Sequence, residues 1–450
     1  MTEADLYYKK MTETPVSHLI IRLGIPTTVS MLITSIYNMA DTYFIGGLGD
    51  TPQAAIGILF TLQAIIQAIA FMLGHGSGSF VAKHLAKKDT DESSKFVSTA
   101  FFAGAILGII ISVFGFIFLE PFMVLLGSTE TILPYAKDYG GWVLASCPFM
   151  ICSLVLNNCL RYEGKAFYAM IGLSTGGILN IFGDWLLIKR LNMGVFGAGM
   201  ATAISQVISF TILIFMFKFN AQSSISFKYI SKKPDTILKI IKVGFPSLIR
   251  QGLTSVSNGI LNNLTNPFGD AAIAAISVVN RFSGFVMCVG LGIGQGFQPV
   301  SSFNYSAGKY KRVKQGLIFT TLLVLAIVTV ISVFSFVFAD NIIYFFQKSA
   351  DVREIGVPAL RFSTVGLIFL SISLPVNMLY QSIQKAGTAT FLSLLRSGLV
   401  FIPILLIFSF ALKLLGIELA QPVSDVLTGL ISLPFIFYFI KTTPDERPAQ

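Results

Sequence analysis

Long apolar runs, separated by short charged or turn-rich breaks, dominate this chain of 450 residues. Each run is long enough for a membrane-spanning helix, which needs about 20 apolar residues. A soluble core could not bury them all, because 54% of the residues are hydrophobic and only 12% are charged. We therefore predict an all-α polytopic membrane protein with 12 transmembrane helices, bent where Pro26, Pro246, Pro375 and Pro403 interrupt a run. The expected spans are residues 18–45, 53–82, 96–119, 136–160, 166–188, 194–217, 238–265, 270–305, 315–338, 356–382, 388–412 and 416–440.

The 32 basic residues divide unequally between the two faces of the membrane. Both termini and the loops on their side hold 22 of them, the opposite loops hold 6, and the spans hold the remaining 4. Because basic loops stay in the cytoplasm, we expect both termini there and the chain in a bacterial inner (cytoplasmic) membrane. The net charge of +10 then reflects topology. The basic cluster at 309–314 is predicted to flank the membrane, and we expect no nucleic-acid partner.

Cysteines and histidines form no catalytic or metal-binding pattern. All four cysteines lie in apolar stretches, and His18, His75 and His84 match no metal motif. A membrane-embedded enzyme would need a nucleophile with a base, or such a motif, so we expect neither an enzyme nor a cofactor. No cleavable signal peptide is expected, because the first apolar segment is long and follows mixed charges.

The two halves of the chain repeat each other at an offset of 220 residues. Residues 24–58 align without a gap to 244–278, and the identities include Gly24 with Gly244 and Pro26 with Pro246. A repeat of six spans returns the chain to the same face, so the halves run the same way across the membrane. We expect an N-terminal lobe (1–217), a cytoplasmic linker (218–237) and a C-terminal lobe (238–450), related by a pseudo-twofold axis along the membrane normal.

The repeat singles out two acidic residues in the first half. Asp41 lies well inside the first span, and its repeat partner is Leu261. Asp184 in the fifth span is a second carboxylate at membrane depth, where a charge costs about 2.5–3.5 kcal/mol and commonly marks a transport pathway or a proton relay. The predicted cation-coupling set consists of Asp41, Asp184, Asn180, Asn157 and Thr202.

Two chemical uses of this set are open. Hard oxygen ligands can hold Na⁺, for which the candidate ligands are Asp41, Asn180, Asp184 and Thr202. Alternatively, two nearby carboxylates in a low dielectric cannot both stay ionised cheaply, so one takes a proton. For the two amides and the hydroxyl, simple hydrogen bonding between helices is the alternative.

Several aromatic and methionine side chains are candidates for an adaptable cavity that receives flat apolar cations. For each of them, packing in the core or against lipid is the alternative. Among the arginines in or near spans, Arg361 and Arg396 are expected to be structural, whereas Arg250 and Arg281 are open. The cavity candidates are Met31, Tyr37, Phe60, Phe149, Met150, Arg281, Phe282 and Met287.

Over nearly its full length the chain resembles the multidrug and toxic compound extrusion (MATE) family, and within it the bacterial MepA-type and DinF-type pumps. The resemblance rests on GIPTTVSMLITSIYNMADTYFIGGLGD (24–50) and its echo at 244–270, NNCLRYEGK (157–165), GILNIFGDWLLI (177–188) and GVFGAGMATAIS (194–205). It implies two six-helix lobes and an N-lobe cation network on Asp41, Asn157, Asn180, Asp184 and Thr202. The glutamate that NorM-type members carry in span seven is Thr254 here, which argues against a cation site in the C-terminal lobe.

We therefore expect a secondary active multidrug efflux antiporter that exports amphipathic, mostly cationic organic compounds in exchange for H⁺ or Na⁺ by alternating access. It would work as a monomer in the lipid bilayer, because two lobes in one chain complete a transport unit. The alternative is a flippase for a lipid-linked precursor, which would need a basic cavity around Arg250 and Arg281. A passive channel fits less well, because the two halves differ in their charged residues.

Overall fold

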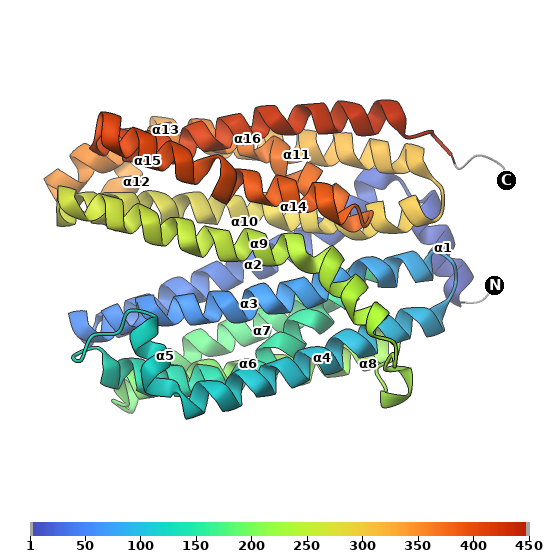
Figure 1. Ribbon diagram of the computed structural model, residues 1–450, viewed down its shortest axis with the longest axis horizontal. Coiled ribbons are helices and arrows are strands. Elements are labelled where there is room, and N and C mark those ends of the chain that lie inside the picture. The colour runs from blue at the N-terminus through green and yellow to red at the C-terminus, as the bar shows by residue number, and fades with distance from the viewer. Residues whose placement is uncertain (1–2, 447–450) are drawn as a thin grey trace. The chain divides into compact units, whose positions relative to one another are not determined.

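The computed structural model describes residues 3–446, and its regular secondary structure in that range is helical throughout (Figure 1). Each predicted span coincides with a long helix, so the expected spans are confirmed to within a few residues. These helices are α2 (Val16–Gly46), α3 (Asp50–Leu85), α4 (Thr90–Ile117), α6 (Leu133–Tyr162), α7 (Ala166–Asp184) with the π-helix η1 (Trp185–Arg190), α8 (Gly194–Asn220), α9 (Pro234–Thr265), α10 (Asp270–Ser306), α11 (Tyr310–Val337), α13 (Ala350–Ser382), α14 (Ala386–Leu394) with the π-helix η4 (Leu395–Leu399) and α15 (Phe401–Leu412), and α16 (Leu414–Thr442).

Eleven of these helical segments within the described residues are long and apolar enough to cross a membrane. The twelfth span is α9, which has 32 residues and is long enough but carries Lys239, Lys242 and Arg250. The chain is therefore a multi-pass membrane protein with the predicted twelve-helix architecture.

Three short helices fall outside the predicted spans: α1 (Glu3–Glu13), α5 (Leu119–Leu125) and α12 (Ala339–Phe346). Short 3-10 turns, η2 (Phe227–Tyr229) and η3 (Asn266–Phe268), complete the chain. The sequence did not reveal α5 and α12, because one or two turns are too short to show a helical period. They nevertheless begin 220 residues apart, at the offset of the repeat.

Loop backbones confirm the repeat independently of side-chain identity. Several residues adopt a positive φ, a conformation that L-residues rarely take. Three pairs of them lie 220 residues apart, and two of these pairs combine different residue types. These pairs are Gly49 (φ 127°) with Gly269 (88°), Lys88 (60°) with Gly308 (77°), and Gly164 (71°) with Gln384 (64°).

The chain forms two compact units whose boundaries differ from the predicted lobes of 1–217 and 238–450. Unit 1 comprises the residues up to Lys10 and Val29–Gln251, and unit 2 comprises Met11–Thr28 and Gly252–Gln450. One boundary falls within the short helix α1, and the other two cut through long helices, α2 and α9. The first part of each of these long helices belongs to the unit built mainly from the other repeat.

Glycines let the first parts of α2 and α9 approach the backbone of a neighbouring helix closely. In unit 2, a Cβ added to Gly24 would lie 3.2 Å from the Cα of Ile293 in α10. In unit 1, a Cβ on Gly244 would lie 1.8 Å from the carbonyl oxygen of Met72 in α3. Backbone therefore packs close to backbone in both units. A Cβ at residue 244 would overlap the Met72 carbonyl, whereas a Cβ at residue 24 would make a tight contact, so glycine suits both positions of the repeat.

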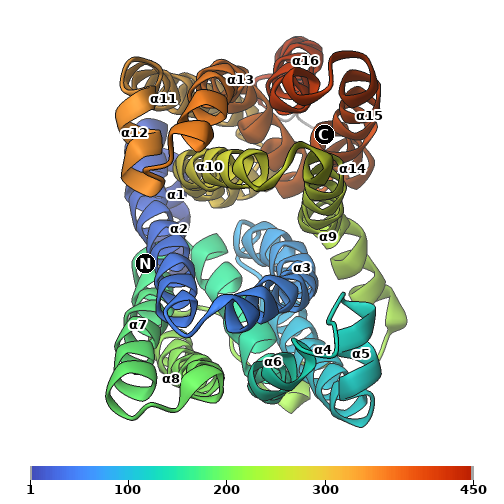
Figure 2. The same cartoon turned by 90° about the vertical axis from the view of Figure 1, so that its left-hand side faces the viewer.

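The helices within unit 1 and the helices within unit 2 are arranged in the same way (Figure 2). In unit 1, α6 lies beside α3, α4 and α8, and α7 packs on α8. In unit 2, α13 takes the corresponding place beside α10, α11 and α16, and α15 packs on α16. The central helices α6 and α13 are thus repeat partners, and buried side chains on them form much of each core.

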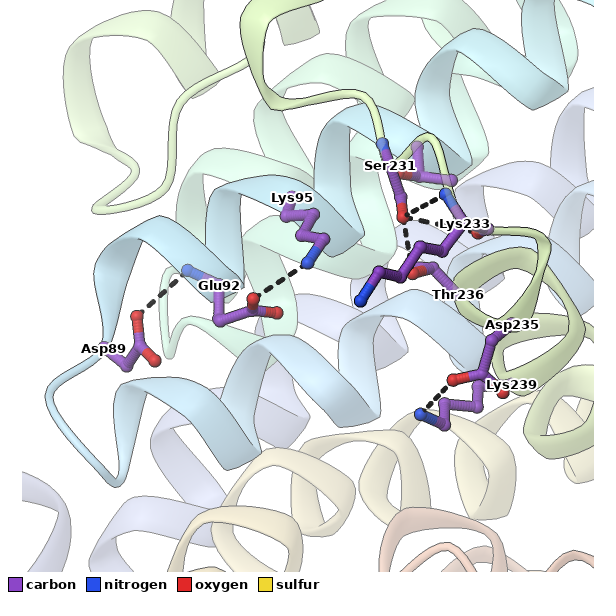
Figure 3. Close-up of polar contacts among 9 residues, drawn as sticks. Asp89, Glu92, Lys95, Ser231, Lys233, Asp235, Thr236 and Lys239 are labelled. Atoms are coloured by element: carbon purple, nitrogen blue, oxygen red, sulfur yellow. Dashed lines mark hydrogen bonds and ion pairs between the residues drawn. The ribbon is translucent and has the colours of Figure 1, made fainter.

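The segment between α8 and α9 is shorter than the predicted linker of 218–237, since α8 continues to Asn220 and α9 begins at Pro234. Side chains of α4 hold its backbone: the Ser224 and Ser231 amides donate to the hydroxyls of Ser94 (2.9 Å) and Thr99 (3.0 Å). Figure 3 shows the end of this segment, where the Ser231 hydroxyl meets Thr236 at the start of α9. The segment is therefore an ordered part of unit 1.

Candidate functional site

Asp41 is the centre of a buried polar cluster in unit 1. Its side chain lies in α2 and is 2% exposed. The Tyr139 hydroxyl in α6 donates a 2.8 Å hydrogen bond to Asp41 Oδ2 and lies 3.1 Å from Thr202 Oγ1 in α8. Asn180 Nδ2 in α7 donates to the same Thr202 oxygen at 3.0 Å. The cluster therefore joins four helices around one carboxylate.

The hydrogen bonds in this cluster have a defined direction. Tyr139 has a single O–H, which it donates to Asp41, so the Thr202 hydroxyl must donate to the Tyr139 oxygen. The donors therefore run in order from Asn180 through Thr202 and Tyr139 to Asp41. Gln63 Nε2 in α3 adds a second donor to the Tyr139 oxygen at 3.4 Å. This arrangement stabilises negative charge on Asp41.

Asp184 is also buried and lies at the last residue of α7, where the π-helix η1 begins. Neither of its carboxyl oxygens has a hydrogen-bond partner among the described residues, and the same is true of Asp41 Oδ1 and Asn180 Oδ1. The Asp184 and Asp41 carboxyls are close enough to interact electrostatically. Unit 1 thus holds four buried oxygen atoms without a hydrogen-bond donor, and oxygen atoms of this kind can accept a proton or bind a hard cation. A π-helical turn at such a position is common at functional sites.

Glycines bring the helices of the cluster together. A Cβ on Gly177 of α7 would lie 2.8 Å from Ile33 Cγ2 and 3.1 Å from Tyr37 Cδ1 of α2. A Cβ on Gly199 of α8 would lie 3.0 Å from the Cα of Tyr139. The sequence GILNIFGD therefore supplies both the polar side chains and the small residues that let α7 approach α2.

Asn157 is the one member of the predicted coupling set that the contacts do not bring to this cluster. Its Nδ2 donates to the carbonyl oxygen of Ala169 at 3.0 Å. Its repeat partner Asn377 makes the same bond to Ala389 at 2.9 Å in unit 2. Because both repeats preserve this bond, it ties the central helix to the next span and supports the interhelical alternative for Asn157.

The second repeat replaces the polar cluster with apolar core. Leu261, the partner of Asp41, and Ala359, the partner of Tyr139, are both buried in one hydrophobic cluster of unit 2. Ile404, the partner of Asp184, packs against the same cluster. The two carboxylates and the tyrosine therefore have no equivalents at these positions of unit 2.

Tyr139 and Gln63 are site residues that the sequence reasoning missed. Carboxylates and amides stand out within an apolar span, whereas a tyrosine near the start of a span is typical of an interfacial aromatic. Only the hydrogen bond from the Tyr139 hydroxyl to Asp41 shows that this side chain belongs to the cluster.

The predicted cavity residues divide between the two units. Within unit 1, Tyr37 lies within electrostatic range of both Asp41 and Asp184, and Phe149 packs edge-to-face on Phe210. Met150 is buried, whereas Met31 and Phe60 are partly exposed. Within unit 2, Arg281 is exposed, and Phe282 and Met287 are partly buried.

Arg361 and Arg396 have the structural surroundings that were expected of them. Arg361 Nε donates to the carbonyl oxygen of Phe336 at 3.4 Å, and Arg396 Nε pairs with Asp425 Oδ1 at 3.1 Å. In the described part of the chain, no group of three or more histidine, cysteine or acidic side chains could hold a metal ion.

Known proteins resemble this chain over almost its whole length. It is 26% identical over 440 residues to the multidrug export protein MepA of Staphylococcus saprophyticus, covering 97% of this chain and 96% of that protein. The MepA protein of Staphylococcus aureus is likewise 26% identical over 442 residues, with the same coverage.

Solved structures share the fold. An outward-facing multidrug resistance MATE family transporter superposes with a TM-score of 0.91 at 23% identity, covering 98% of this chain and 100% of that one. A transporter of the MOP superfamily from Pyrococcus furiosus gives a TM-score of 0.90 at 23% identity, covering 96% and 98%. The MatE family model matches twice, at residues 26–186 and 246–407, once in each repeat. The chain therefore belongs to the MatE family, the multidrug and toxic compound extrusion family that its motifs resemble.

Proposed function

We propose that this protein is a secondary active antiporter that exports amphipathic, mostly cationic organic compounds in exchange for H⁺ or Na⁺. The observation that carries the proposal is the one-sided acid cluster: Asp41 and Asp184 are buried in unit 1 with open carboxyl oxygens, whereas their partners in unit 2 are apolar. Family membership and the resemblance to multidrug export proteins support export as the direction of transport.

Cation binding would act through the contact between α2 and α6. With Asp41 ionised, its charge holds the Tyr139 hydroxyl at 2.8 Å. A proton or Na⁺ on Asp41 neutralises that charge and competes for the same oxygens, so the contact weakens. Asp184 would complete the ligand set or share the proton, because two nearby buried carboxylates do not both stay ionised cheaply. α2 is then released to move, and Pro26, which interrupts its backbone hydrogen bonding, provides a place to bend.

The membrane potential would drive this cycle. A positive charge that moves inward releases roughly 2.3 kcal/mol per 100 mV. The basic loops and both termini would face the cytoplasm of a bacterial cell, as the distribution of lysine and arginine favours. One chain contains both repeats, so a monomer would suffice, and no step calls for a catalytic residue or a cofactor.

The deciding experiment is dye export from reconstituted vesicles under a proton gradient and, separately, a sodium gradient. We expect one gradient to drive transport by the wild-type protein and the double variant Asp41→Asn, Asp184→Asn to lose it. Wild-type rates for that variant under both gradients would exclude coupling through unit 1. Gradient-independent movement of a lipid-linked anion by the same vesicles would instead favour the flippase alternative.

A further inference from the structure

The two short helices α5 and α12 carry the same unusual surface. Each presents an apolar side chain that is almost fully exposed: Leu125 is 80% exposed and Phe345 is 82% exposed. These two residues are partners at the 220-residue offset. So are Phe118 and Phe338, which precede the helices and are 53% and 43% exposed. Both repeats therefore carry large apolar side chains at the same outward positions, identical at 118 and 338 and different at 125 and 345.

The opposite face of each short helix is fixed to its own unit. In unit 1, Met123 is fully buried, and its Cε lies 3.1 Å from the place where a Cβ on Gly140 of α6 would be. In unit 2, Ile343, the partner of Met123, is fully buried. Its Cδ1 lies 3.2 Å from the place where a Cβ on Gly356 of α13 would be. Each helix thus has one buried and one exposed apolar face, and the exposed face is available to something outside the fold.

A salt bridge links the first turn of each short helix to the long helix that follows it. Lys137 Nζ in α6 lies 3.0 Å from Glu120 Oε2, and Arg353 Nη2 in α13 lies 2.7 Å from Asp340 Oδ2. Glu120 and Asp340 are repeat partners and occupy the first turn of their helices. Both pairs are solvent-accessible. Charged groups therefore lie beside the exposed apolar side chains, as at a lipid headgroup boundary.

The exposed faces continue the lipid-facing surface of the preceding spans. At the end of α4, Phe114 and Ile117 are 58% and 65% exposed, and at the end of α11 their partners Phe334 and Val337 are 58% and 62% exposed. These spans cross the hydrocarbon, so their exposed apolar side chains contact lipid. The same apolar surface runs on into Phe118 and α5, and into Phe338 and α12.

We propose that α5 and α12 lie in the plane of the membrane interface as anchors, with Leu125 and Phe345 inserted among the upper acyl chains. An exposed apolar face next to solvent-accessible charged groups suits this boundary, where apolar side chains reach the acyl chains and charges reach the headgroups. α5 follows the third span and α12 follows the ninth, so both act on the membrane face opposite the N-terminus. The partner is the lipid surface itself, and the anchors set the depth at which α6 and α13 enter the bilayer.

Tryptophan fluorescence tests the depth of these positions. The two native tryptophans, Trp142 and Trp185, are replaced by Phe, and Leu125→Trp or Phe345→Trp is introduced. Each variant is reconstituted into phosphatidylcholine vesicles whose chains carry bromine either near the headgroup or near the bilayer centre, and aqueous iodide is added in parallel. We expect strong quenching by the shallow bromines, weaker quenching by the deep bromines and little quenching by iodide.

Two matched positions calibrate the measurement. Ile106→Trp, in the middle of α4 and 58% exposed in the wild type, should respond most to the deep bromines. Glu130→Trp, an exposed position shortly after α5, should respond to iodide. If Leu125→Trp and Phe345→Trp behave like Glu130→Trp, the proposal is overturned. Protection from both quenchers would mean that protein covers the helices and would overturn it equally. If one variant does not reconstitute, the other decides, because the repeat predicts the same result for both.

Discussion

Tyr139 donates its only hydroxyl proton to Asp41, and the corresponding positions of the second repeat hold Ala359 and Leu261 in an apolar cluster. One repeat therefore keeps a carboxylate with a dedicated donor where the other keeps a packed core. The chain thus stays symmetric in its backbone and loses symmetry at this pair, which is why the proposed function places cation coupling in unit 1.

The Tyr139 donor should matter for transport without being needed for folding. Tyr139→Phe removes one hydrogen bond to a charged group, worth about 1.5 kcal/mol or more, and we expect transport to fall roughly tenfold. The control is Tyr135→Phe, one turn earlier on the same helix and 37% exposed. Initial rates of dye export from vesicles measure both variants. Equal rates for the two would show that the Tyr139 contact is incidental.

Asp184 and Asp425, two buried aspartates of the spans, should respond differently to loss of their charge. Asp184 has no hydrogen-bond partner among the described residues, so Asp184→Asn removes an uncompensated buried carboxylate, and we expect the melting temperature to hold or rise while transport is lost. Asp425 receives hydrogen bonds from Arg396 (3.1 Å) and Gln421 (2.9 Å). Asp425→Asn leaves the arginine charge uncompensated, so we expect a stability loss of about 2 kcal/mol. Thermal melts in detergent compare the pair, and a lower melting temperature for Asp184→Asn would contradict this account.

Comparing alanine variants of Asn157 and its repeat partner Asn377 distinguishes a role in stability from a role in cation coupling. Each donates to a carbonyl oxygen in the next helix, and Asn377 also donates to Ser393 Oγ at 2.9 Å. Alanine at position 157 should therefore cost about 1–3 kcal/mol, roughly the penalty of an unsatisfied buried group, and alanine at position 377 at least as much. We expect both variants to lose transport only in proportion to their loss of stability. If only Asn157→Ala abolishes transport at unchanged stability, Asn157 belongs to the coupling set after all.

Ionisation of Glu163, in the loop after α6, should lower the free energy of unfolding as the pH rises. Burial raises the pKa of Glu163 to about 7 from its ordinary value of 4.5, although hydrogen bonds from Ser223 and Gln222 oppose the shift. The folded state therefore holds this proton more tightly than the unfolded chain. The resulting stabilisation, up to about 3 kcal/mol, is complete below pH 4.5 and is lost as the pH rises through 7.

Melting temperatures between pH 4.5 and 8 test this expectation. Glu163→Gln, which mimics the protonated form, should flatten the decline, whereas Glu92→Gln, at an exposed carboxylate of α4, should leave it unchanged. A pH profile that is identical for the wild type and Glu163→Gln would show that another group is responsible.

Much of the fold could be predicted because hydropathy and sequence identity are local signals. The spans follow from the apolar runs, and the repeat follows from residues such as Gly24 and Gly244. Asp41 and Asp184 stand out because a carboxylate at membrane depth is costly. All of these depend on one residue or one run at a time.

Features that depend on packing were out of reach of the sequence. Tyr139 becomes a site residue only through its hydrogen bond to Asp41. The Asn157 amide donates to the Ala169 carbonyl, and this direction depends on how two helices pack, which the residues around Asn157 do not reveal. The unit boundaries inside α2 and α9 were missed for the same reason, since a continuous helix carries no mark where its packing partners change. The short helices α5 and α12 lie below the length at which periodicity is readable.

The division of α2 and α9 between the units has a consequence for the single repeat. A single repeat could not complete its own unit, because residues 11–28 pack with the second repeat and residues 234–251 pack with the first. Two copies of a six-span half could complete such a unit only by exchanging the beginnings of their first helices, and the joined chain makes this exchange within one molecule.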